Sequence, residues 1–166
     1  MTIAERFYRV THKKYIAEGG KIPYYYKYSL KKIITKPIRK FISAVVIPTI
    51  PFNNLRIAMY RLCGYKIGKN VFIGMRCYLD DMHYDKIIIE DNVTISYGVY
   101  FACHGRKQRP SIIVLKRNCY IGMRASIIAP TNIEIGEFAI VGAGTLVNKS
   151  VPSNKVSVGI PNKILD

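Results

Sequence analysis

From Ile67 onward, hydrophobic positions recur every six residues along the chain. Each hexad begins with an aliphatic residue or a phenylalanine, is often followed by Gly, and has a small or apolar residue in its fifth place. The twelve first residues are Ile67, Ile73, Leu79, Ile89, Ile95, Phe101, Leu115, Ile121, Ile127, Ile135, Val141 and Val147. One hexad predicts one short strand and one turn, and three hexads predict a triangular coil of about 18 residues. The expected fold class is therefore mainly β, a parallel β-helix with these side chains stacked inside.

The N-terminal third shows a different pattern and is expected to be helical or irregular. Residues 30–46 place apolar side chains three or four apart among lysines, which predicts an amphipathic helix interrupted at Pro37. Residues 54–63 predict a second short helix, with Asn53 or Asn54 as its N-cap. The predicted division is an N-terminal basic helical segment, 1–62, and a β-helix domain, 63–166.

Three irregularities interrupt the hexads, after Leu79, Phe101 and Ile127. Extra residues in a solenoid form loops on its surface, and such loops carry function. The longest irregularity contains the sequence HGRKQRP at residues 104–110. We therefore expect chemistry at His104 or close to it.

Charge is concentrated at the N-terminal end of the chain. The whole sequence has 26 Lys and Arg against 10 Asp and Glu, and 15 of the basic residues but 2 of the acids fall in residues 1–69. No zinc-finger spacing or aromatic RNA-binding signature accompanies this charge, so we expect no nucleic-acid partner. Two interpretations remain open: a helix that packs on the body of the protein, or peripheral contact with an anionic membrane.

Cellular location is predicted from the cysteines and from the hydrophobic runs. The four cysteines form no C-x-x-C pair, and the chain opens without a secretory signal. The longest apolar run, residues 41–52, is broken by two prolines and is too short to span a bilayer. We expect a cytoplasmic protein with reduced thiols, peripheral at the inner membrane face if the basic segment binds lipid.

Several segments carry a resemblance to a known family. They are YGVYFACHG at 97–105, YIGMRASI at 120–127, VGAGTLVNKSVP at 141–152 and VGIPNKIL at 158–165. Over about residues 60–166 the chain resembles the hexapeptide-repeat acetyltransferases, most of all those that O-acetylate capsular and other surface polysaccharides. The resemblance implies left-handed coils, acetyl-CoA as donor, direct transfer to a hydroxyl and no metal.

Catalytic and acceptor residues follow from the same resemblance. His104 matches the catalytic histidine of the family, and an imidazole suits a general base that accepts the proton of a hydroxyl. His83 is the second candidate. Asp80 and Asp81 match acidic residues that line the acceptor site, although capping of a turn explains them equally well. A nucleophilic Cys103 beside His104 is disfavoured, because adjacent residues of a strand point to opposite faces.

The donor site is also assigned by resemblance. The expected acetyl-CoA contacts are Gly122, Met123, Arg124, Ala143, Asn148, Lys149 and Lys163. Gly122 and Met123 match the place near the thioester, where a backbone N–H stabilises the oxyanion. Ala143 must be small to let the pantetheine arm pass, and the last three residues match positions near the CoA phosphates and adenine. Arg124 is assigned to a CoA phosphate or an acidic acceptor.

The resemblance further implies a homotrimer with active sites between subunits. The favoured function is O-acetylation of a sugar or surface-polysaccharide precursor. Met75 and Arg76 replace an asparagine found in some soluble sugar acetyltransferases, which disfavours a simple sugar. The alternatives are an acetyltransferase for a small soluble acceptor (serine, a free sugar or an antibiotic) and a non-catalytic β-helix scaffold. A related carbonic anhydrase would need three clustered histidines, and the three in this chain lie far apart in sequence.

Overall fold

The computed structural model describes residues 1–23, 30–105 and 109–165. The chain divides into two compact units, Met1–Phe41 and Ile42–Asp166. A boundary between residues 62 and 63 stays a prediction, and the helix that precedes it belongs to the compact unit of the coils.

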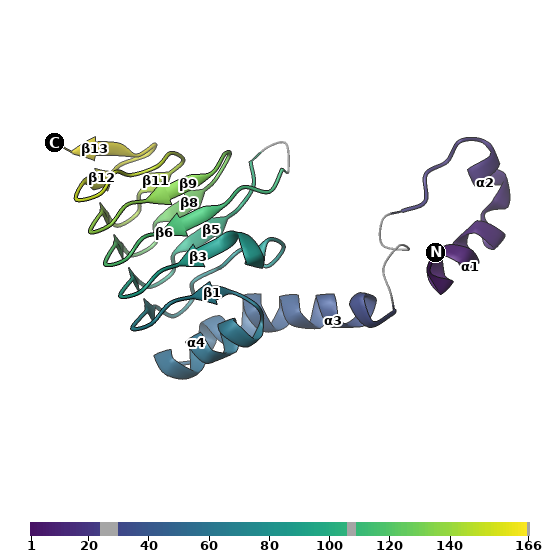
Figure 1. Ribbon diagram of the computed structural model, residues 1–166, viewed down its shortest axis with the longest axis horizontal. Coiled ribbons are helices and arrows are strands. Elements are labelled where there is room, and N and C mark those ends of the chain that lie inside the picture. The colour runs from purple at the N-terminus through teal and green to yellow at the C-terminus, as the bar shows by residue number, and fades with distance from the viewer. Residues whose placement is uncertain (24–29, 106–108, 166) are drawn as a thin grey trace. The chain divides into compact units, whose positions relative to one another are not determined.

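The described residues of the first unit form helices α1 (Ile3–Thr11), α2 (Lys13–Ala17) and α3 (Leu30–Phe41) (Figure 1). Thr2 begins α1 as its N-cap, because its hydroxyl oxygen accepts from the Glu5 N–H at 3.1 Å. Helix α3 runs through Pro37, so the expected interruption there is wrong. A proline removes one N–H donor but holds φ close to the helical value, and the helix continues past it.

The second unit opens with η2 (Ile42–Val46), η3 (Ile47–Thr49) and α4 (Asn53–Leu62). Helix α4 was predicted correctly to within a residue at each end, but its N-cap residue is Phe52. The Asn53 side chain instead bonds to the first coil, where Nδ2 donates to Val71 O at 3.1 Å and Oδ1 accepts from Ile73 N at 3.0 Å. Buried Arg56 bonds to the same coil through Nε and Ile73 O at 2.8 Å. These contacts fix α4 to the first coil.

We predict that Asn53→Ala lowers the free energy of unfolding by about 1–3 kcal/mol. The loss follows because the substitution leaves Val71 O and Ile73 N without the amide that now pairs with both. Urea denaturation followed by circular dichroism measures the change. The matched control is Asn54→Ala, at an exposed position next to it, which should change stability by less than about 0.5 kcal/mol. Equal effects of the two variants would contradict the assigned role.

The remaining chain winds through three sheets, which we name A, B and C. Sheet A contains β1 (Lys66–Ile67), β3 (Ile87–Ile89), β6 (Ile113–Leu115) and β9 (Ile133–Ile135). Sheet B contains β2 (Phe72–Ile73), β4 (Thr94–Ile95), β7 (Tyr120–Ile121), β10 (Ile140–Val141), β12 (Val156–Val158) and β13 (Lys163–Leu165). Sheet C contains β5 (Tyr100–Ala102), β8 (Ser126–Ile128) and β11 (Leu146–Val147), and a short 3-10 helix, η4 (Tyr84–Lys86), precedes β3. Among these strands, every pairing is parallel except that of β12 with β13, so the coils form the predicted parallel β-helix (Figure 1).

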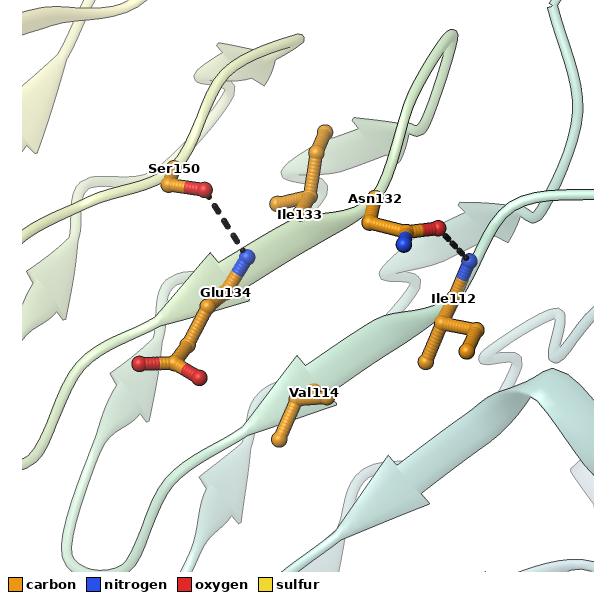
Figure 2. Close-up of a pocket in the computed structure, with 6 residues that line it drawn as sticks. All are labelled: Ile112, Val114, Asn132, Ile133, Glu134 and Ser150. Atoms are coloured by element: carbon orange, nitrogen blue, oxygen red, sulfur yellow. Dashed lines mark hydrogen bonds between the residues drawn. The ribbon is translucent and has the colours of Figure 1, made fainter.

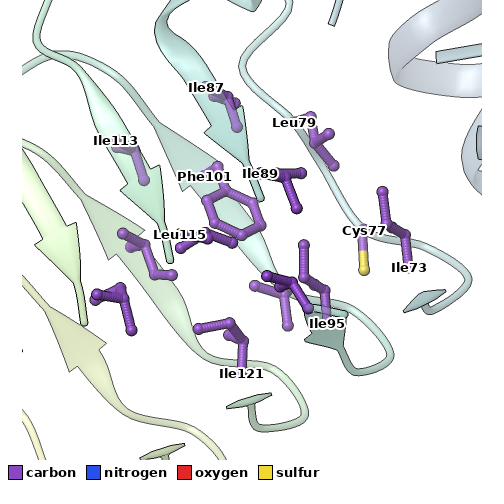
Figure 3. Close-up of a cluster of buried hydrophobic side chains, with 14 of the residues drawn as sticks. Ile73, Cys77, Leu79, Ile87, Ile89, Ile95, Phe101, Ile113, Leu115 and Ile121 are labelled. Atoms are coloured by element: carbon purple, nitrogen blue, oxygen red, sulfur yellow. The ribbon is translucent and has the colours of Figure 1, made fainter. Parts of the chain in front are cut away.

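First-position side chains of the hexads form the core of the β-helix (Figure 3). The register stacks them coil upon coil: Ile73 pairs with Ile95, Ile95 with Ile121, and Ile121 with Val141. Eleven of the twelve are buried, and Ile67 at the open end is partly buried. The prediction that they share one interior is confirmed.

The corners use two positions of the hexad for two different reasons. In eight of the twelve hexads the residue in fourth place adopts a left-handed conformation; these residues are Asn70, Arg76, Asn92, Gly98, Asn118, Arg124, Phe138 and Gly144. Glycines in second place have an ordinary φ, but the neighbouring coil leaves no space for a side chain. A Cβ on Gly122, for example, would lie 2.5 Å from Ala143 N on the next coil. At the second place, therefore, tight space rather than a special backbone angle explains the recurring glycine.

Candidate active site

Two surface loops, one from the first coil and one from the second, meet at one corner of the β-helix. One loop follows Leu79 and the other follows β5 at residue 102. The second loop leaves and returns through a narrow neck, in which Ser111 N donates to Cys103 O at 2.7 Å and His104 bridges to Pro110. Within the neck, Gly105 packs against Pro130 of the following coil.

Asp80 joins the two loops. Its Oδ1 accepts from the N–H groups of Met82 at 2.9 Å and His83 at 3.0 Å, and its Oδ2 accepts from Cys103 N at 2.8 Å. The side chain is almost fully buried. Burial raises the pKa of the carboxyl, but the bonds from Cys103, His83 and Met82 outweigh it, so the net pKa is lowered. Asp80 is therefore a fixed carboxylate.

The same carboxylate brings the two loop histidines together. His83 Nδ1 lies 3.4 Å from Asp80 Oδ2, and its side chain retains 19% of its exposure. The His83 and His104 rings meet edge to face, with centroids 5.7 Å apart and planes at 62°. Both rings are partly exposed. The structure thus brings both histidine candidates together. The Asp80 carboxylate lies beside His83, and the His83 ring contacts the His104 ring.

Asp81 points toward a pair of tyrosines. Its Oδ1 accepts from the Tyr78 hydroxyl at 2.9 Å, and the Tyr78 ring stacks on Tyr100 of the next coil with centroids 4.7 Å apart. Tyr100 retains 44% exposure. Tyr100 belongs to β5, the strand that leads to His104. The tyrosines were not identified from the sequence, although their equivalent places in successive coils predict that they stack.

Cys103 is buried beside Asp80. Burial first, and then the negative charges of Asp80 and Asp85, raise the pKa of the thiol to about 12. At neutral pH the sulfur therefore stays protonated and is a poor nucleophile. This agrees with the expectation that Cys103 does not act as a covalent catalyst.

The predicted donor residues fall into two groups. Gly122, Met123, Arg124 and Ala143 are adjacent, between sheets B and C, in the third and fourth coils. The Gly122 N–H donates to Val141 O at 2.7 Å, so it is not available for an oxyanion. Met123 O accepts from Gly144 N at 2.8 Å and its side chain is exposed, which leaves the Met123 N–H as the candidate donor of this pair.

Asn148, Lys149 and Lys163 are exposed near the C-terminal end of the coils. Asn148 N donates to Oδ1 of Asn162 at 3.3 Å, and Asn162 Nδ2 donates to Ser157 Oγ at 2.9 Å. Asn162 is buried and holds the closing segment against β11, a role that the sequence did not indicate. Asn162 directly precedes Lys163 and therefore fixes the position from which the Lys163 side chain extends into solvent.

Two shallow hollows lie elsewhere on the described surface. One, of about 220 Å³, is on the outer side of β6 and β9 and is lined by Ile112, Val114, Asn132, Ile133, Glu134 and Ser150 (Figure 2). The other, of about 270 Å³, is lined by Glu90, Asp91, Asn92 and Arg117. Neither contains a predicted site residue. Among the described residues, no group of three or more His, Cys, Asp or Glu side chains is arranged to hold a metal ion.

Comparison with known proteins supports this reading of the fold and the repeats. The family described as "hexapeptide repeat of succinyl-transferase" matches residues 65–101 and 116–149. A putative acetyltransferase of Bacillus subtilis, YvoF, is 28% identical over 78% of this chain and 77% of its own length. The galactoside O-acetyltransferase of Escherichia coli is 26% identical over 61% of this chain and 56% of its own length.

Solved structures agree on the fold. A hexapeptide-repeat acetyltransferase from Vibrio cholerae has a TM-score of 0.62 at 21% identity, over 81% of this chain and 92% of its own. A serine acetyltransferase of Brucella abortus in complex with coenzyme A has a TM-score of 0.52 at 20% identity, over 80% of this chain and 54% of its own. With the repeats and the β-helix, these matches show a hexapeptide-repeat fold, and the chain is similar to acetyltransferases that share it.

Proposed function

We propose that this protein transfers an acetyl group from acetyl-CoA to a hydroxyl of a sugar or surface-polysaccharide precursor, with His104 as the general base. The observation that carries the proposal is the cluster of Asp80, His83 and His104 at the loops of an acetyltransferase-like β-helix. The galactoside O-acetyltransferase among the relatives supports a sugar acceptor. His83 is the second candidate for the base.

Each step of the transfer has a group suited to it. An imidazole nitrogen of His104 accepts the hydroxyl proton while the oxygen attacks the thioester carbonyl carbon. In this proposal the Met123 N–H donates to the oxyanion of the tetrahedral intermediate. The carbon–sulfur bond then breaks, and the imidazolium returns its proton to the CoA thiolate. The protonated Cys103 thiol supports direct attack without an acyl-enzyme.

The donor and acceptor contacts extend this proposal. Arg124, Lys149 and Lys163 supply positive charge for the CoA phosphates, and Ala143 and Asn148 line the same path. Asp81, held by the Tyr78 hydroxyl, offers a carboxylate for acceptor hydroxyls beside the aromatic pair.

A homotrimer with sites between subunits is part of the proposal. The outer face of sheet B supports it, because Phe72, Tyr120 and Ile140 stay 42–47% exposed in one aligned row.

The test is an acetyl-transfer assay that follows release of the CoA thiol with acetyl-CoA and a panel of acceptors. We expect glycosides and oligosaccharides to react at least about tenfold faster than serine, because the Tyr78 and Tyr100 rings present an apolar face to a sugar ring. Product mass spectrometry should place the acetyl group on oxygen. A preference for serine would favour the small-acceptor alternative, and no binding of acetyl-CoA by calorimetry would favour the scaffold.

A further inference from the structure

Helix α1 exposes a row of large apolar side chains. Ile3, Phe7 and Val10 are 78%, 67% and 73% exposed. Their spacing of four and then three residues places them on one face of the helix. The opposite side carries Tyr8, which is buried and stacks on His12 with centroids 4.1 Å apart. The helix therefore packs one side within its unit and offers the other, apolar side to an outside partner.

Helix α3 shows the same arrangement among those of its side chains that the structure describes. Ile38 and Phe41 are 54% and 60% exposed and lie three residues apart. Lys36, Arg39 and Lys40 belong to the same stretch of helix, on other sides of it. Helices α1 and α3 of the first unit thus each combine an exposed apolar row with basic residues.

The positive charge of the first unit indicates which class of partner its exposed apolar rows contact. Residues 1–41 contain 11 Lys and Arg against 2 acids. Nucleic acid is bound through basic side chains and does not require an exposed aliphatic and aromatic row. An anionic bilayer surface matches both features at once, because lipid headgroups attract the lysines and arginines while the acyl boundary accepts the apolar row.

We propose that the first unit, Met1–Phe41, binds the surface of an anionic membrane. The rows of α1 and α3 insert into the acyl boundary, and Arg6, Lys13 and Lys14 lie at the headgroups. Among the described residues, no helix is long and apolar enough to cross a bilayer. The helices therefore lie in the plane of the interface. Lipid binding does not rest on the proposed acetyl transfer and can be measured without it.

The experiment is co-sedimentation of the full chain with vesicles. Vesicles of phosphatidylglycerol and phosphatidylcholine should bind the protein at least about tenfold more tightly than phosphatidylcholine alone, and raising salt from 0.1 to 0.5 M should weaken binding. Phe7→Asp should lower the affinity at least about tenfold, because it places a charge in the apolar row. Lys13→Glu combined with Lys14→Glu should lower it to a similar degree.

The matched control is Leu62→Asp, the same kind of change at an 87% exposed leucine of α4 in the other unit. It should bind vesicles as the unchanged protein does. Circular dichroism confirms that each variant is folded. Equal binding to both kinds of vesicle, equal loss in the control and in Phe7→Asp, or no vesicle binding together with tight binding to RNA or DNA would each overturn the proposal.

Discussion

Replacement of His104 by alanine is expected to lower kcat for acetyl transfer by about 10²–10⁴-fold, the usual contribution of a general base. His104 lies at the neck of a surface loop and is partly exposed, so its removal leaves the stacked core intact. The thermal midpoint should therefore stay within a few degrees of that of the unchanged protein. The KM for acetyl-CoA should change little, because the base acts on the acceptor hydroxyl. Steady-state kinetics with a saturating glycoside measures the effect.

Two further histidine variants make this result specific. His12→Ala, in the first unit, should keep full activity. His83→Ala should lower kcat less than His104→Ala does, because we place His83 between the fixed carboxylate and the base. Full activity of His104→Ala combined with a large loss in His83→Ala would transfer the role of base to His83. Full activity in both would exclude the histidine mechanism.

The fold was predictable because the hexad pattern that specifies it is local and repeated. An aliphatic residue every six positions reports a buried strand residue directly, and Ile73, Ile95 and Ile121 do stack as the repeat requires. The lengths of the interruptions also showed where loops leave the coils. The hexads do not predict how α4 is attached to the coils. This attachment depends on the side chains of Asn53 and Arg56, which bond to backbone groups about 20 residues away. Such polar contacts have no periodicity.

The candidate site was predictable in part for a similar reason. His104 and Asp80 each fall in an interruption of the repeat, but their proximity depends on two loops from different coils that fold toward each other. The contact of His83 with both residues follows from that geometry. At Gly122, sequence matching placed a residue near the thioester, whereas the direction of its N–H, toward Val141 O, is set by the pairing of coils. Backbone direction of this kind is not encoded in residue type.

Removal of the Asp80 carboxylate should damage stability and activity together. Asp80→Ala leaves the N–H groups of Cys103, Met82 and His83 without their acceptor inside the protein. We expect the free energy of unfolding to fall by about 3 kcal/mol, since bonds to a charged acceptor contribute about 1.5–3 kcal/mol each and water replaces part of the loss. Urea denaturation measures it. Asp85→Ala, at a side chain that is 51% exposed, is the control and should cost less than about 1 kcal/mol.

The lowered pKa of Asp80 also determines in which direction the stability of the protein changes with pH. A carboxyl whose pKa is lower in the folded state stabilises the protein fully above the unfolded pKa, about 3.9 for Asp, and loses that contribution as pH falls through the folded value. The difference in stability between the unchanged protein and Asp80→Asn should therefore be constant near neutral pH and shrink below about pH 4. A difference that grows on acidification would contradict an ionised Asp80. Because the same carboxylate joins the loops of His83 and His104, Asp80→Asn should lower kcat even at pH 7, where the fold remains intact.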